Sequence, residues 1–108
     1  MNMPLGALRF YLALTKKRAT LVEGKALFKL GEINELGRGE TQKNEKKALQ
    51  LYIASAQTGY TDAEVAIGRF YEEGKGGLQK DEKKALKWYK NAAKKGNKSA
   101  IEVLDGKN

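Results

Sequence analysis

Residues 63–100 read AEVAIGRFYEEGKGGLQKDEKKALKWYKNAAKKGNKSA, and residues 26–63 read ALFKLGEINELGRGETQKNEKKALQLYIASAQTGYTDA. A shift of 37 residues aligns the two stretches without a gap, and sixteen of the 38 aligned positions are identical. The block Glu-Lys-Lys-Ala-Leu at 45–49 recurs unchanged at 82–86. An ungapped match with glycines in register indicates an internal duplication, and a period of this length is typical of solenoid proteins.

Each repeat unit predicts a first helix with apolar residues spaced three and four apart. In the first unit this helix is expected over residues 26–36, and in the second over residues 62–73. Gly37 and Gly74 follow these segments directly. A left-handed glycine commonly ends a helix, so both glycines are predicted as stop positions.

A second helix is predicted in each unit after a short loop. Asn44 and Asp81 are good N-cap residues, and an acidic residue follows each of them in the first turn. The second helices are expected to stop at Gly59 and Gly96. Two helix pairs bury too little surface alone, so flanking segments are expected to cap them.

The predicted fold is a single all-α domain over residues 1–108, a short solenoid of helix-turn-helix units with about six helices. Its expected parts are an N-terminal cap helix (5–19), repeat 1 (24–60), repeat 2 (61–97) and a C-terminal cap helix (98–105).

The second unit resembles a Sel1-like repeat, a relative of the tetratricopeptide repeat. The residues that carry the resemblance are Ala63, Ile67, Gly68, Tyr71, Glu72, Glu73, Gly74, Lys75, Gly76, Asp81, Lys84, Ala85, Trp88, Tyr89, Ala92, Ala93, Gly96 and Ala100. The first unit departs from the pattern, with Leu51 at the tryptophan position and Asn34 at the first-helix tyrosine. The resemblance implies a right-handed solenoid and a non-enzymatic adaptor that binds a protein or peptide.

Composition excludes many kinds of catalytic and metal site. The chain has no cysteine and no histidine, which removes disulfides, Ser-His and Cys-His nucleophiles and imidazole or thiolate metal ligands. Glu32 and Glu35 lie on one helix face, but without a pocket or metal they are interpreted as a solvated face. The glycine-rich loops at 37–39 and 74–77 lack the preceding strand of a phosphate-binding loop. No catalytic residue, metal ligand or cofactor is predicted.

The apolar opening stretch over residues 5–14 is interpreted as part of the domain. Lys16, Lys17 and Arg18 follow it, which is the reverse of the charge order in a signal peptide. No run approaches the roughly 20 apolar residues that a membrane span needs. Together with the absence of cysteine, this order makes a cytoplasmic location the expectation.

Partner binding is expected on the concave face, which the first helices of a solenoid present. The side chains that the core pattern leaves free there are Lys29, Glu32, Asn34, Arg69, Glu72 and Glu73. Their mixed charge favours a protein or peptide ligand over a polyanion.

An excess of positive charge offers an alternative. Lysine and arginine number 21 against 13 acidic residues, a net charge of +8. If one helix ran through the whole segment, a continuous stripe would form from Lys83, Lys87, Lys90, Lys94 and Lys98. Such a stripe could bind nucleic acid or an acidic surface. It lacks arginine forks and free aromatic rings for reading bases, so a solvated face is the favoured interpretation.

Overall fold

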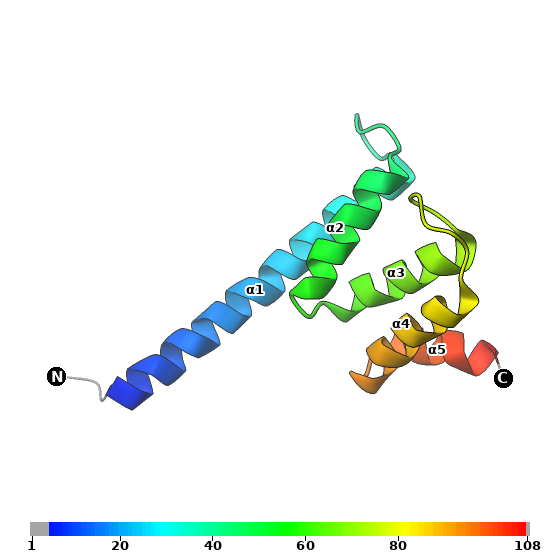
Figure 1. Ribbon diagram of the computed structural model, residues 1–108. Coiled ribbons are helices and arrows are strands. Elements are labelled where there is room, and N and C mark those ends of the chain that lie inside the picture. The colour runs from blue at the N-terminus through cyan, green and yellow to red at the C-terminus, as the bar shows by residue number, and fades with distance from the viewer. Residues whose placement is uncertain (1–4, 108) are drawn as a thin grey trace.

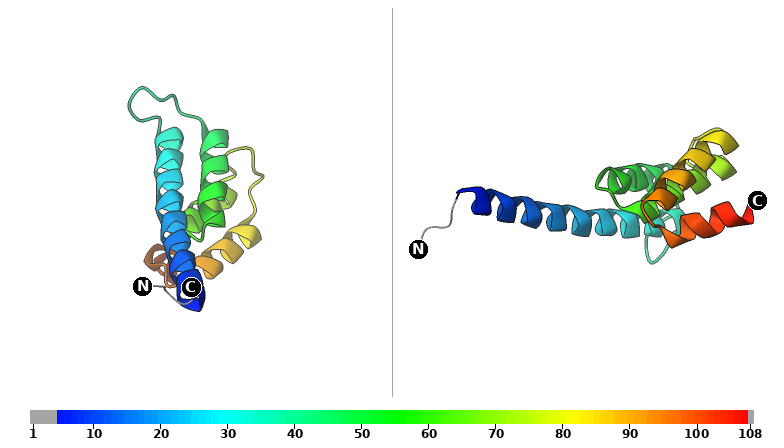
Figure 2. Two further views of the ribbon diagram at one scale, coloured as in Figure 1. Left: turned by 90° about the vertical axis from the view of Figure 1, so that its left-hand side faces the viewer. Right: turned by 90° about the horizontal axis from the view of Figure 1, so that it is seen from below.

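The computed structural model describes residues 5–107, leaving aside the side chains at 5, 8 and 10–19. Five helices follow one another along the chain: α1 (Leu5–Leu36), α2 (Glu45–Gln57), α3 (Thr61–Glu73), α4 (Glu82–Lys94) and α5 (Lys98–Gly106). Neighbouring helices pack as successive pairs, and the N-terminal half of α1 projects away from the others (Figure 1). The side views in Figure 2 show the same projection. The expected all-helical solenoid is confirmed.

There are five helices rather than about six, because the expected cap helix and the first helix of repeat 1 are one continuous helix, α1. Gly24, at the expected junction, is helical and buried against Thr58 and Tyr60 in the turn between α2 and α3. A Cβ atom there would lie 2.0 Å from Thr58 Oγ1, so this glycine provides close approach rather than a chain break. No proline interrupts α1 between its first and last residues.

The predicted helix ends of the repeats are confirmed. The side chains of Asn44 and Asp81 accept hydrogen bonds from the backbone N–H groups of Lys47 and Lys84, both at 3.0 Å. Gly74 ends α3 in the left-handed conformation, with φ +69°. These caps fix the loops that return the chain from α1 to α2 and from α3 to α4.

Within each unit, a buried tyrosine of the second helix packs against a glycine of the first. Tyr52 lies against Gly31, and Tyr89 lies against Gly68. A Cβ atom added at Gly31 or Gly68 would come within 2.5 or 2.7 Å of the tyrosine ring, respectively. The close spacing of the two helices in each unit therefore requires glycine, which has no side chain, at positions 31 and 68.

The junction between the two units is a buried carboxylate. The Glu35 side chain is 7% exposed and accepts hydrogen bonds from Tyr52 of α2 (2.7 Å), Arg69 of α3 (2.8 Å to Oε1) and Lys75 of the following loop (3.0 Å). Three parts of the chain after α1 thus meet at one side chain. The interpretation of Glu35 as a solvated residue is wrong, because its face of α1 is covered by α2 and α3.

Burial alone would raise the pKa of Glu35. The hydrogen bonds from Arg69, Tyr52 and Lys75 outweigh burial and hold its pKa at about 2, against an ordinary value of 4.5. Between about pH 2 and 4.5, the Glu35 carboxylate is therefore mostly ionised in the folded protein and mostly protonated in the unfolded chain.

We expect Gly68→Ala to lower the stability of the fold, because the new methyl group would overlap the Tyr89 ring. The expected loss is about 1–3 kcal/mol, the usual cost of overpacking. Thermal unfolding followed by circular dichroism measures it. Gly106→Ala is the matched control, since nothing lies within 4 Å of its added Cβ atom; an equal loss in both variants would contradict the packing argument.

We expect Glu35→Gln to remove a pH-dependent part of the stability. Because the pKa of Glu35 is lowered on folding, its contribution is present above about pH 4.5 and is lost as the pH falls towards 2. At neutral pH, the free energy of unfolding of the variant should be about 3 kcal/mol lower than that of the wild type. Chemical denaturation across this pH range should show the difference narrowing towards acid.

The control for Glu35→Gln is Glu40→Gln, which removes the same charge from an exposed loop residue. Its stability should follow the wild-type curve at every pH. A constant difference between Glu35→Gln and wild type down to pH 2 would show that the ion pairs are not its cause.

Candidate protein-binding groove

A groove of about 380 Å³ crosses the first helices of the successive units. It is lined by Phe28, Lys29 and Glu32 of α1, Asp62, Val65, Ala66 and Arg69 of α3, and Ser99 of α5. Three helices that are far apart in sequence thus contribute to one surface. This is the surface on which partner binding was predicted.

The floor of the groove is apolar and its rim is charged. Phe28 is half-buried and its ring packs at 5.5 Å from Tyr52 and 5.3 Å from Tyr60, measured between ring centroids. Val65 is also half-buried. On the rim, Lys29 lies 3.5 Å from Glu32, and both side chains remain substantially exposed. The groove can therefore hold an apolar side chain while its rim contacts polar groups.

Three of the six predicted binding residues, Lys29, Glu32 and Arg69, line this groove together. Asn34 does not. It is 7% exposed, and its amide donates a hydrogen bond to the Leu30 carbonyl at 2.8 Å. The expectation that its side chain is left free by the core pattern is wrong, because this face of α1 is covered.

The two remaining predicted residues lie beyond the groove lining. Glu72 forms an ion pair with Lys107 at 2.6 Å. Glu73 is about half exposed, 3.9 Å from Arg69 and 3.5 Å from Lys75. Both carboxylates therefore have cationic neighbours within the chain.

Arg69 has a structural partner behind the groove. Its hydrogen bonds to Glu35 raise its pKa, so the guanidinium stays charged, and they also fix its position on the rim. Because it holds a buried carboxylate, replacing Arg69 would disturb the junction between units as well as the groove.

Five groove residues were missed by the sequence interpretation: Phe28, Asp62, Val65, Ala66 and Ser99. The repeat period could have found Ala66, which lies 37 residues after the predicted Lys29. The other four form two pairs with the same spacing, Phe28 with Val65 and Asp62 with Ser99, but neither member of either pair was predicted. Equivalent positions of stacked units line the same surface.

The lysine stripe is shorter than predicted. α4 ends at Lys94, the chain turns at Gly96 with φ +88°, and Lys98 starts α5. Asn97 caps the new helix by accepting a hydrogen bond from the Ala100 N–H. The lysine row therefore consists of Lys83, Lys87, Lys90 and Lys94. These four are exposed, and none forms an ion pair with a residue that the structure describes.

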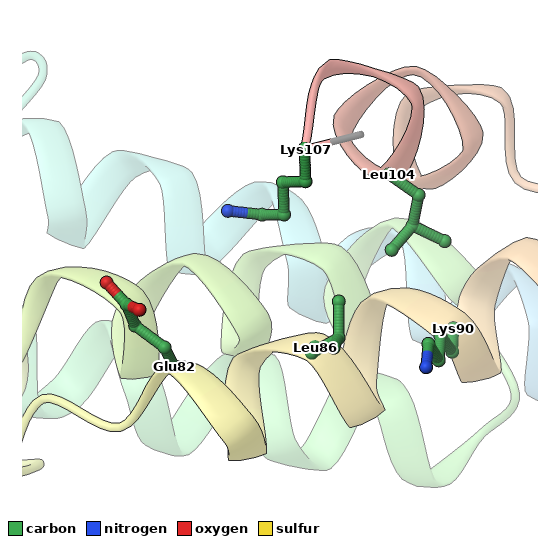
Figure 3. Close-up of a pocket in the computed structure, with 5 residues that line it drawn as sticks. All are labelled: Glu82, Leu86, Lys90, Leu104 and Lys107. Carbon is green, nitrogen blue, oxygen red and sulfur yellow. The ribbon is translucent and has the colours of Figure 1, made fainter.

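A second pocket, of about 420 Å³, lies between α4 and α5 (Figure 3). It is lined by Glu82, Leu86 and Lys90 of α4 and by Leu104 and Lys107 of α5. Leu104 points from α5 towards α4, and Leu86 points back towards it. Lys90 belongs both to this pocket and to the lysine row.

Within residues 5–107, no group of three or more acidic side chains is placed to hold a metal ion. None of the described helices combines the length and apolar character that a membrane crossing requires.

The chain was compared with known proteins. The model of the Sel1 repeat family matches residues 24–60 and 61–97. A solved Sel1 repeat protein from Oxalobacter formigenes is 35% identical, with a TM-score of 0.70 over 77% of this chain and 61% of that one. Cysteine-rich protein B of Helicobacter pylori is 29% identical, with a TM-score of 0.67 over 74% of this chain and 59% of that one.

A third structure is c5321, a protective antigen of uropathogenic Escherichia coli strains. It is 33% identical, with a TM-score of 0.60 over 71% of this chain and 16% of that one. No curated protein matches the chain. This chain spans about three fifths of the length of the first two solved structures. Two matched repeats, which cover most of the chain, and their stacking in the fold show that it belongs to the Sel1 repeat family.

Proposed function

We propose that this protein is a non-enzymatic adaptor that binds a peptide segment of a partner protein in the groove of α1, α3 and α5. Sel1 repeat proteins are generally protein–protein interaction modules and are typically scaffolds without enzymatic activity. The observation that carries the choice of surface is the groove itself, whose lining comes from three successive first helices.

The chemistry of the groove fits a peptide. The half-buried Phe28 and Val65 offer an apolar floor for one side chain. Lys29 and Arg69 supply positive charge along the rim, and Glu32 and Asp62 supply negative charge. A balanced rim with an apolar floor suits a segment that carries both polar and apolar side chains, whereas a polyanion would meet as much repulsion as attraction.

The test begins with peptides selected from a random display library on the immobilised wild-type protein. We expect the selected peptides to lose at least about tenfold in affinity for the double variant Lys29→Glu/Val65→Glu, because it changes the floor and one rim charge. Isothermal titration measures the affinities. Arg69 is left intact in this design, since it also holds Glu35.

Lys83→Glu/Lys94→Glu is the matched control on α4, and it should leave these affinities unchanged. Circular dichroism of each variant verifies that the helices are intact. The assignment of the groove would be overturned if the selected peptides lost affinity for the α4 variant and kept their affinity for the groove variant.

A further inference from the structure

We propose that the open side of α4 and α5 is a second docking surface, which binds an acidic amphipathic helix of a partner protein. The surface consists of the α4–α5 pocket, the neighbouring lysine row and Ile101. It does not rest on the function proposed for the groove, which is formed by different side chains.

The repeat register shows what normally covers such a surface. Leu86 and Leu104 correspond, one repeat later, to Leu49 and Ile67. Those two residues are only 8% and 2% exposed. Trp88 of α4 and Leu78 of the preceding loop pack against the cluster that contains them. At the boundary between the two units, α4 thus covers the crevice between α2 and α3.

The equivalent crevice between α4 and α5 has no such cover among the described residues. Leu86 and Leu104 are half-buried and line the pocket, and Ile101 is 41% exposed. Ile101 corresponds to Glu64, which accepts hydrogen bonds from Asn91 of α4 and from Lys95, directly after α4. By register, Ile101 therefore faces the place that a following helix would take.

Asp105 argues against a third unit of the same kind in that place. It corresponds to Gly68, where a tyrosine ring packs so closely that a Cβ atom would lie 2.7 Å away. A helix that carried the tyrosine of the repeat pattern could not approach Asp105 in the same way. The surface suits a helix that packs further out, at the ordinary distance between helices of about 8–10 Å.

Charge selects the kind of helix. Lys90 and Lys107 border the pocket, and the rest of the lysine row, Lys83, Lys87 and Lys94, lies beside it on α4. The acidic groups on this side are Glu82, Asp105 and Glu72, which pairs with Lys107 at 2.6 Å. The four lysines of the row and Lys107 outnumber them. A helix with an apolar stripe over Leu86, Ile101 and Leu104 and carboxylates towards α4 would complement both features.

The experiment uses two synthetic peptides of about 16 residues, long enough to form a helix on a surface. Both carry leucine at i, i+3, i+4 and i+7, and they differ only in their polar flank, which is glutamate in one and lysine in the other. We expect the full chain to bind the glutamate peptide and not the lysine peptide in isothermal titration, with shifts of the α4 and α5 amide signals in NMR spectra.

Charge reversal then tests the pairing. The affinity of Lys87→Glu/Lys90→Glu for the glutamate peptide should be lower by about tenfold or more, and this variant should bind the lysine peptide instead. Ile101→Asp leaves every lysine in place. It should still lower the affinity for the glutamate peptide, because it puts a charge in the apolar stripe. Ile101 is exposed enough that the fold should tolerate this change, and circular dichroism verifies it.

The matched control is Lys46→Glu/Lys47→Glu, which makes the same change in charge on α2 and should leave binding unchanged. Equal loss in this control, or equal binding of both peptides, would overturn the proposal. So would binding of a short DNA duplex that competes with the glutamate peptide and is insensitive to Ile101→Asp, since that result indicates a general polyanion site. Lys29→Glu/Val65→Glu should have no effect, which keeps this result separate from that of the groove. Asp62 is left intact in this control, since it bonds Asn97, the N-cap of α5.

Discussion

Tyr52 of α2 contacts both α1 and α3, and the rest of the structure depends on these contacts. Its ring packs on Gly31 and on Phe28 of α1, and it meets the Phe70 ring of α3 edge-on at 5.6 Å. Its hydroxyl donates to Glu35, the carboxylate that also binds Arg69 and Lys75. One residue thus sets the distance between the helices of the first unit and anchors the charge that holds the second.

The position of the groove follows from this anchoring. Arg69 is held on the rim by Glu35, and Phe28 is held in the floor by its contacts with Tyr52 and Tyr60. A surface fixed from behind is preorganised, so a ligand would lose less free energy in ordering it. Because Arg69 both lines the groove and bonds Glu35, replacing it would disturb the groove and the junction between the units together.

The repeat pattern predicted most of the fold because its caps and glycines act locally. Asn44, Asp81 and Gly74 perform the roles expected from their neighbours in sequence. Burial of Glu35 was not predictable in this way, since the partners that hold it lie 17, 34 and 40 residues further along the chain. The stripe that included Lys98 required one helix to run through Gly96, whereas the glycine ends the helix, as the repeat pattern predicted.

The interior of the solenoid and its last described helix, α5, differ in how firmly they are held. The crevice between α2 and α3 is closed by the following unit, whereas α5 has nine residues and buries Ala100 alone among them. In a structure whose units contact only their neighbours, local unfolding starts where the contacts are fewest. Amide hydrogens of α5 should therefore exchange with solvent sooner than those of α3, and a helix bound beside α5 would slow that exchange by lengthening the cooperative unit.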